Sequence, residues 1–300
     1  LIRFCLLHFC PPLISFPAKN NSIDDHDYGQ NNGDITYQYK TESNLAFVDF
    51  LYADEKDVCN DSQDIMGRNQ APDENASVRS KMNDPMYKRA LEGKGVYGVQ
   101  LFDFSPSRRA ASSRNSNILW GGGYWVPDHE ARIDPDIIGA PFNATAVNYS
   151  TTHSVAIFAL DVRSNKTPWP KGKQKHAASD NQSCTSSNSS AINPPSLDFL
   201  GQKQWEWFSE ALANSRAAVN IIVSGLQIHP ERFPNDGNII EEWSKFPEAR
   251  QMLYDMILNS GVRSPLLVSG DVHMAQILRK DCILGNDFRE NPQKRPLIEI

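Results

Sequence analysis

The sequence has no apolar run of the roughly 20 residues that a membrane-spanning helix needs, so we expect no transmembrane segment in it. It has no basic excess either: 36 Asp and Glu against 30 Lys and Arg give a net charge of -6, which predicts no nucleic-acid-binding surface. The five cysteines show neither a CxxC pair nor zinc-finger spacing, and their odd number excludes complete pairing within the chain. What remains is an ordinary globular composition over 300 residues, enough for one large domain or two smaller ones.

Glycosylation triplets of the form Asn-X-Ser/Thr are frequent, whereas chance would supply roughly three of them. They begin at Asn20, Asn60, Asn75, Asn143, Asn148, Asn165, Asn181 and Asn188. Most fall in polar, loop-like stretches, where glycans can be accommodated. Asn- and Ser-rich loops also produce such triplets by accident. The sequence nevertheless favours the secretory pathway, with an extracellular or endomembrane location.

An alternation of strands and amphipathic helices fills the second half of the chain. We expect strands at 154–163, 218–228 and 265–269, separated by helices at 201–215 and 247–260. Further strands are expected at 95–104, 275–283 and 295–300, and a short helix around 45–51. This β-α-β-α-β order predicts an α/β fold with helices covering a sheet. Sheets of this kind bind their ligands beyond the carboxyl ends of the strands.

The segment Ser269-Gly270-Asp271-Val272-His273, at the end of the last of these three strands, is a candidate metal site. In an extended chain, Asp271 and His273 would lie on the same face while Val272 returns to the core. A carboxylate and an imidazole that converge are suitable ligands for a divalent metal. A surface Asp and a buried His at a strand tip would produce the same pattern, so this segment alone leaves both interpretations open.

A second cluster, Asp24-Asp25-His26-Asp27, lies far upstream and is followed by turn-forming residues. Its carboxylates would repel one another unless a cation lies among them. A solvated acidic turn explains the cluster equally well when it is considered alone. The two clusters together raise the possibility of one shared metal centre.

Two further side chains follow expected strands. Arg163 at a carboxyl end would suit a phosphate through its planar fork of donors, or it forms a salt bridge with Asp161 at the rim. His229 follows the 218–228 strand and could reach a metal, although a single histidine is more often structural.

With both clusters in view, the sequence resembles the PhoD-like alkaline phosphatase/phosphodiesterase family of the metallophosphoesterase superfamily. The matching segments occur in the family's order over roughly residues 23–300. They are DDHDYGQN from Asp24, LDVR from Leu160, Gly201 with QWEW from Gln204, VSGLQ from Val223, EW from Glu242 with FP from Phe246 and Arg250, and SGDVH from Ser269.

The resemblance implies a four-layer α/β/β/α metallophosphoesterase-like sandwich, incomplete in this chain. It also implies roles for the upstream cluster. Asp25 binds metal, His26 donates a proton to the leaving alkoxide, and Asp27 orients His26. The implied reaction is metal-dependent hydrolysis of phosphate monoesters or diesters.

The same resemblance makes Asp271 and His273 the remaining metal ligands, with Asn31 a weaker candidate near the metal. Arg163 would face the phosphate of the substrate. Carboxylate-rich ligation suits Ca, Mn or Fe, and Zn is the other option. The metal would be a divalent or trivalent ion.

The family carries further metal-binding Asp residues upstream of the DDH motif that have no counterpart here. We therefore interpret 1–22 as a non-homologous or mistranslated start. Residues 23–300 are then a partial domain with polar insertions near 53–94, 105–149 and 167–196. We expect catalysis to belong to a full-length parent, and this chain to be inactive or poorly folded. Two alternatives are a catalytically inactive glycosylated binding or surface protein that retains the fold, and an enzyme acting on another anionic ester.

Overall fold

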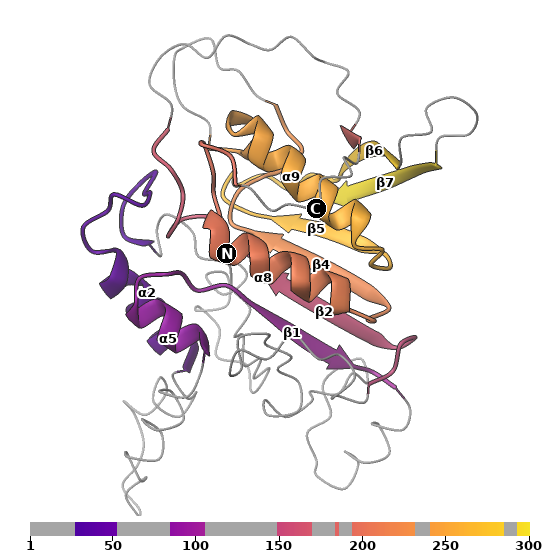
Figure 1. Ribbon diagram of the computed structural model, residues 1–300, viewed down its shortest axis with the longest axis horizontal. Coiled ribbons are helices and arrows are strands. Elements are labelled where there is room, and N and C mark those ends of the chain that lie inside the picture. The colour runs from indigo at the N-terminus through magenta and orange to yellow at the C-terminus, as the bar shows by residue number, and fades with distance from the viewer. Residues whose placement is uncertain are drawn as a thin grey trace, which may run out of the picture.

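A mixed sheet organises the part of the molecule that the structure describes, with the strand order β1-β2-β4-β5-β7-β6-β3 (Figure 1). The computed structural model describes residues 28–52, 85–105, 149–169, 184–185, 194–231, 241–284 and 293–300. The strands are β1 Gly98–Asp103, β2 Ser154–Ala159, β3 Cys184–Thr185, β4 Val219–Ser224, β5 Pro265–Ser269, β6 Leu278–Leu284 and β7 Gln293–Glu299. The predicted α/β class is therefore confirmed.

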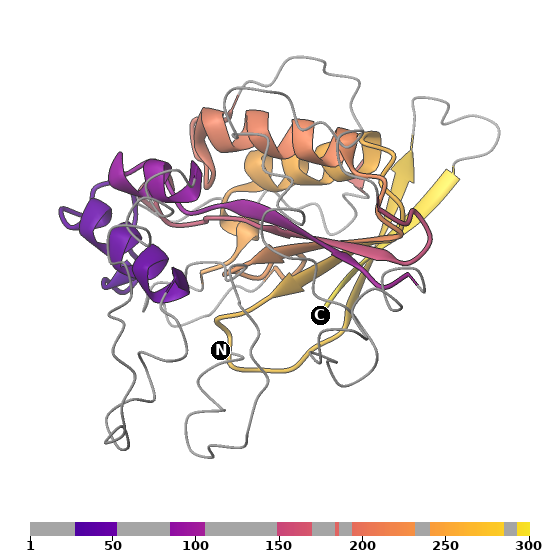
Figure 2. The ribbon, with the colours of Figure 1, turned by 90° about the horizontal axis from the view of Figure 1, so that it is seen from below.

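The centre of the sheet is parallel. β2, β4, β5 and β7 run in one direction, while β1 and β6 are antiparallel to β2 and β7. Helix α8 (Gly201–Asn214) joins β2 to β4, and α9 (Pro247–Asn259) joins β4 to β5 after the short 3-10 helix η3 (Trp243–Lys245). Right-handed crossovers that step in the same direction place their helices on the same face. Figure 2 shows α8 and α9 together above one face of the sheet.

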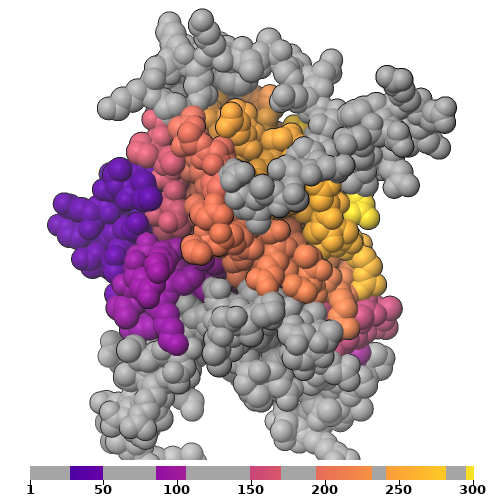
Figure 3. Space-filling model, in the orientation of Figure 1, coloured from indigo at the N-terminus to yellow at the C-terminus, as the bar shows by residue number. Residues whose placement is uncertain are grey.

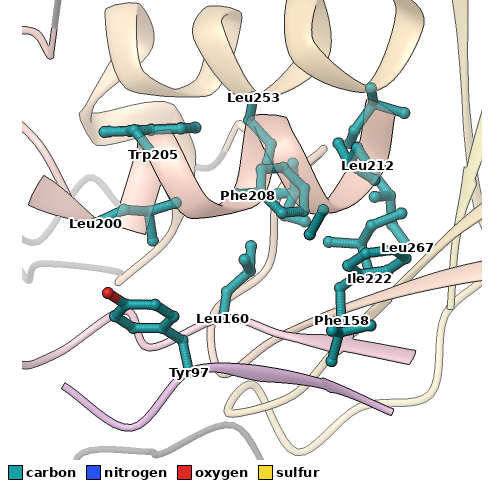
Figure 4. Packing of buried hydrophobic residues seen from close by; sticks show 14 of the residues in the cluster. Tyr97, Phe158, Leu160, Leu200, Trp205, Phe208, Leu212, Ile222, Leu253 and Leu267 are labelled. Atoms are coloured by element: carbon teal, nitrogen blue, oxygen red, sulfur yellow. The ribbon is translucent and has the colours of Figure 1, made fainter. Parts of the chain in front are cut away.

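The main core lies between that face and the two helices. Phe158 of β2, Ile222 of β4 and Leu267 of β5 are completely buried there. Figure 4 shows them facing Phe208 of α8 and Leu253 of α9. The rings of Phe158 and Phe208 meet edge to face, with centroids 6.1 Å apart. Such contacts add to the area-dependent stabilisation from burial, which is about 1.5–3 kcal/mol for each large apolar side chain.

The predicted β-α-β-α-β order is confirmed, but two strands are shorter than expected. β2 ends at Ala159 because the backbone of Asp161 bonds the side-chain amide of Gln204 and not a neighbouring strand. Gln204 Oε1 accepts from Asp161 N at 2.8 Å. Gln204 Nε2 donates back to Asp161 O at 2.9 Å. β4 ends at Ser224, whose hydroxyl bonds both the N–H and the C=O of Leu226.

A smaller helical lobe lies beside the start of β1. It consists of α2 (Lys40–Tyr52) and α5 (Pro85–Leu91), packed on a second apolar cluster. The members of this cluster are Tyr28, Phe47, Val48, Met86, Ala90 and Val96. Figure 3 shows this lobe at the left, in contact with the body of the molecule. α2 begins earlier than the predicted 45–51, and α5 has no counterpart in the sequence prediction.

No helix in the described ranges is both long and apolar enough to cross a membrane.

Candidate functional site at the carboxyl ends of the parallel strands

Three loops leave the carboxyl ends of β2, β4 and β5. The described parts of these loops are residues 160–169, 225–231 and 270–277. The last two begin side by side, since a Cβ added at Gly270 would lie 3.9 Å from the carbonyl oxygen of Gly225. This edge is where an open parallel sheet positions ligands.

The Asp271–His273 turn is not extended, so the predicted alternation of side chains is wrong. β5 ends at Ser269, and Asp271 and His273 then take φ angles of 76° and 54°. Val272 N donates to Gly270 O at 3.0 Å within this turn. Left-handed backbone is uncommon outside glycine and concentrates at functional sites. Asp271 is partly buried and His273 is exposed, and their roles as metal ligands stay predictions.

Arg163 lies in the loop after β2 and is completely buried. Its Nη1 donates to Glu241 Oε2 at 2.6 Å. Glu241 also accepts a hydrogen bond from Trp169 Nε1 at 3.0 Å. Because Arg163 and Asp161 are both fully buried, a salt bridge at the solvent rim is wrong. Contact between Arg163 and a phosphate stays a prediction.

Asp161 organises the loop that carries Arg163. Its Oδ1 accepts from the backbone N–H groups of Arg163 and Ser164, both at 2.9 Å. Its Oδ2 accepts from Val96 N at 2.8 Å, which joins the loop to the chain entering β1. A carboxylate that accepts three backbone N–H bonds is fixed in place, so Asp161 serves as a framework for Arg163.

Lys166 is a completely buried cation that sequence reasoning missed. Its Nζ lies 3.6 Å from Glu241 Oε1, donates to Asn32 O at 3.2 Å and sits 4.3 Å from the ring centre of Trp169. The pKa of Lys166 is lowered to about 8, chiefly by burial and also by the charge of Arg163, while Glu241 opposes the shift. No periodicity in the polar run 163–166 could have indicated burial.

The segment that follows the upstream acidic cluster packs against this loop. Tyr28 is completely buried, and burial raises its pKa, with the carboxylates of Asp161 and Asp34 adding to the rise. Ile35 N donates to Lys166 O at 2.8 Å. Residues just downstream of the acidic cluster therefore lie against the loop that carries Arg163.

The other predicted residues of that region are placed as follows. Asn31 is exposed, in the turn that precedes Gly33. Asp25, His26 and Asp27 lie outside the described residues, so their predicted meeting with Asp271 and His273 stays a prediction.

His229 is structural. Its Nδ1 lies 3.0 Å from Tyr254 Oη, and its Nε2 lies 3.2 Å from Leu297 O, so both ring nitrogens have protein partners. Burial lowers the pKa of His229, and the nearby carboxylate of Glu299 partly offsets this. Glu299 also accepts from the backbone N–H groups of Ile228 and His229, at 2.7 and 2.6 Å. It is a second organising carboxylate that the sequence did not indicate.

The described residues alone do not complete a metal site. Within these ranges, no group of three or more His, Cys, Asp or Glu side chains is arranged to hold a metal ion. Asp161 and His229 are engaged with the protein, and Asp271 and His273 are only two residues of suitable donor type. A complete centre needs further ligands from elsewhere in the chain, such as Asp25.

The architecture defines an α/β protein whose polar loops gather at the carboxyl edge of a parallel sheet. A family model described as PhoD-like phosphatase matches residues 143–296, which include β2, α8, β4, α9, β5 and β6. The chain therefore belongs to the PhoD-like phosphatase family, and the resemblance inferred from the sequence is confirmed.

Among solved structures, one titled "Structure of PhoD" matches with 18% sequence identity and a TM-score of 0.28. The match covers 42% of this chain and 22% of that one, so the chain spans about a fifth of its length. Among curated proteins, no significant match to this chain is found.

Proposed function

We propose that this chain forms part of a metal-dependent hydrolase of phosphate monoesters or diesters. The observation that carries the proposal is the packing of residues 28–35 against the loop 161–166. This contact brings the residues just after the acidic cluster to the carboxyl end of β2, next to the ends of β4 and β5. Membership of a phosphatase family supports the same conclusion.

Arg163 is proposed to bind the phosphate of the substrate. A guanidinium offers a planar set of donors that matches phosphate oxygens. The carboxylate of Glu241, 2.6 Å from Arg163 Nη1, would hold that plane in one orientation. The bonds from Asp161 to the backbone of the same loop would limit its movement. Because Arg163 is completely buried, a phosphate would have to displace the groups that cover it, and would then meet a preorganised donor at low cost in side-chain entropy.

His26 is proposed to donate a proton to the leaving alkoxide, and Asp27 to orient its imidazole. These residues stand directly before Tyr28, which is buried beside Asp161. Protonation of the departing oxygen removes its negative charge as the ester bond breaks.

Asp25, Asp271, His273 and Asn31 are the residues proposed to hold the metal, which would be Ca, Mn, Fe or Zn. When bound, such an ion neutralises phosphate charge and lowers the pKa of a bound water. The left-handed backbone at Asp271 and His273 supports a functional role for this turn.

We further propose the four-layer α/β/β/α arrangement for the complete domain. The face of the sheet opposite α8 and α9 is also apolar. It carries the partly buried residues Val155, Ile157, Val219, Ile221, Val223, Leu266 and Val268. Strands that are apolar on both faces are typical of sheets covered on both sides. A second sheet packed on this face would complete the sandwich. The secretory location, with a phosphate ester as substrate, is part of the same proposal.

The test combines metal content with phosphatase activity. Hydrolysis of p-nitrophenyl phosphate and bis-p-nitrophenyl phosphate is measured for the full-length parent and for this chain, with Ca, Mn, Fe or Zn supplied in turn. We expect Asp271→Asn and His273→Ala to lose bound metal and at least about 100-fold in kcat/KM. Elemental analysis of the same samples measures the metal.

The control variants are Asp255→Asn on α9 and His153→Ala at the amino end of β2, which should keep both metal and activity. If Asp271→Asn and His273→Ala hold as much metal as the unsubstituted protein, the metal assignment fails. If metal is lost but neither ester is hydrolysed by the parent, an inactive binding protein with the same fold is favoured instead.

A further inference from the structure

Glu299, the last residue of β7, connects the two loops that begin side by side at the carboxyl edge of the sheet. It is only 1% exposed. Its Oε1 accepts hydrogen bonds from Ile228 N at 2.7 Å and from Ser269 Oγ at 2.6 Å, and its Oε2 accepts one from His229 N at 2.6 Å. Ile228 and His229 belong to the loop after β4, and Ser269 is the last residue of β5. One carboxylate therefore ties the end of β5 to the loop that leaves the neighbouring strand.

Ser269 is held by β7 through its side chain and its backbone. β5 and β7 are parallel, and Leu267 is opposite Glu299 in their register, so the side chains of Glu299 and Ser269 lie on the same face of the sheet. Ser269 N also donates to Ile300 O at 2.9 Å. A buried carboxylate needs several donors in place of water, and hydrogen bonds to it are stronger than those between neutral groups. The bond from Ser269 to Glu299 is therefore a firm anchor for the end of β5.

The turn at 270–273 starts directly after this anchor. Asp271 and His273 have φ angles of 76° and 54°, a left-handed backbone that costs energy in residues other than glycine. Such a conformation persists only where the surrounding structure holds it. Within the turn, Val272 N donates to Gly270 O at 3.0 Å. The point at which the turn leaves β5 decides where the side chains of Asp271 and His273 begin.

We propose that Glu299 is a positioning residue for the proposed metal-binding turn. Through Ser269 it fixes the point at which the chain leaves β5, and through Ile228 and His229 it fixes the loop after β4 beside that point. The turn would then present its carboxylate and its imidazole to a metal ion with little reorganisation, which favours binding. The metal part of this inference rests on the proposed function, whereas the anchoring of the turn does not.

Hydrogen exchange tests the anchoring without any metal. Exchange at the backbone amides of 270–273 is followed by mass spectrometry in the metal-free full-length parent. Ser269→Ala removes one bond and leaves those from Ile228 and His229 in place, so we expect exchange in the turn to increase at least about 10-fold. Ser269→Thr keeps a hydroxyl and should exchange like the unsubstituted protein. Glu299→Gln, which sets an amide N–H against a backbone N–H, should show a larger increase.

Ser260→Ala is the matched control. Ser260 Oγ donates to Ile257 O at 2.8 Å after α9, so this variant also loses a hydroxyl bond, but near the opposite end of β5 from the turn. It should leave exchange at 270–273 unchanged. Urea denaturation of all the variants separates a change in the turn from a general loss of stability.

Metal affinity gives a second measurement. Mn²⁺ alone is titrated into the same metal-free proteins, and the unbound ion is counted by electron paramagnetic resonance. We expect the Kd for Mn²⁺ to rise about 10–100-fold in Ser269→Ala and Glu299→Gln, and to stay unchanged in Ser269→Thr and Ser260→Ala. A role confined to stability would lower the urea midpoint and leave the Kd unchanged.

The possible outcomes are distinct. Unchanged exchange at 270–273 in Ser269→Ala overturns the proposal. Faster exchange with an unchanged Kd overturns its metal part, because the turn would be anchored without being positioned for an ion. If the unsubstituted parent does not bind Mn²⁺, the proposed metal centre fails, and hydrogen exchange still decides the anchoring. If Glu299→Gln does not fold, the variants of Ser269 decide.

Discussion

Lys166 and Arg163 share the single carboxylate of Glu241 in a space closed to solvent. Burying charged groups is costly, and their mutual attraction repays this only when each has good partners. Lys166 has three partners: Glu241, the carbonyl of Asn32 and the ring of Trp169. Its lowered pKa indicates that they do not fully replace water.

The lowered pKa predicts that stability rises at alkaline pH. Lys166 loses its proton at about pH 8 in the folded protein and near pH 10.5 when unfolded. Between these values the unfolded state binds more protons, so the free energy of unfolding increases with pH. We expect the free energy of unfolding of the unsubstituted protein to rise, relative to that of Lys166→Met, by about 1.4 kcal/mol per pH unit between pH 8 and pH 10.5. Urea denaturation at pH 7.5 and 9.5 measures this difference.

Lys203→Met provides the control for that experiment, because Lys203 is a mostly exposed lysine on α8. Its difference from the unsubstituted protein should be the same at both pH values. Parallel pH profiles for Lys166→Met and the unsubstituted protein would show that Lys166 does not titrate in this range.

At the residue scale, the sequence identified which side chains are candidates for chemistry, but not whether they are buried or which residues they contact. Arg163 was selected as an important residue, but its burial and its bond to Glu241 depend on a residue far along the chain. The sequence around His229 fits both a metal ligand and a structural residue, because its partners Tyr254 and Leu297 come from two other elements. The triplet at Asn165 looked suited to a glycan, yet its amide donates to Lys94 O at 3.1 Å. Such contacts leave no local signal in the sequence.

The loop after β2 joins the sheet to the helical lobe. Asp161 binds Val96 N, and Ser164 Oγ donates to Asn44 Oδ1 of α2 at 3.0 Å. Gly95 makes the first contact possible. Its φ is +112°, and a Cβ at this position would lie only 2.7 Å from Asp161 Oδ2. Glycine is required there both by backbone conformation and by space.

Comparison of two glycines separates these requirements. Gly261, which follows α9, has a φ of +72° and nothing within 4 Å of an added Cβ. Gly261→Ala should therefore cost about 1 kcal/mol, from backbone strain alone. Gly95→Ala should cost about 1–3 kcal/mol more, because it also displaces the Asp161 carboxylate from Val96 N. Urea denaturation of both variants checks this order, and equal losses would contradict the role assigned to Asp161.

Element boundaries were predictable where the local pattern and the tertiary structure agree. The ranges of α8 and α9 match the prediction within one residue, since their apolar stripes face one core and Pro247 suits the first turn of α9. The extended form predicted for Asp271 and His273 was wrong because the strand pattern was continued beyond Ser269. Period-2 patterns contain no signal for a left-handed turn. β3 was missed since two residues are too few for any period.

The whole sheet has two apolar faces, and α8 and α9 cover one of them. Alternate residues of β2 and β4 are fully buried toward the helices, whereas the intervening ones are partly buried. The proposed second sheet would remove these intervening side chains from water.

A charged substitution tests whether this face is covered. Ile221→Lys would place an ammonium group between the two sheets, so we expect a loss of at least about 3 kcal/mol in the full-length parent. Ile35→Lys is the control, since Ile35 is 43% exposed, and it should change stability by no more than about 0.5 kcal/mol. Chemical denaturation measures both. Equal, small effects would mean that the face is open and that the sandwich is not formed.

At this scale the sequence predicted the α/β class, the β-α-β-α-β order and the family. The alternation of apolar strands with amphipathic helices carries most of the information about a sheet of this type. It did not predict α5, the antiparallel pairing of β1 with β2, or the contacts between 28–52 and 161–166 that attach the helical lobe.

The adjacency of β2, β4 and β5 limits how selective the proposed centre can be. Loops on neighbouring strands start about 4.8 Å apart, so the three together span roughly 10 Å. That width suits the phosphoryl group and the atoms directly attached to it. Preference for one alcohol over another would then have to arise in the longer connections outside this edge. Such connections can vary among homologues without disturbing the strands, which would let one scaffold serve different esters.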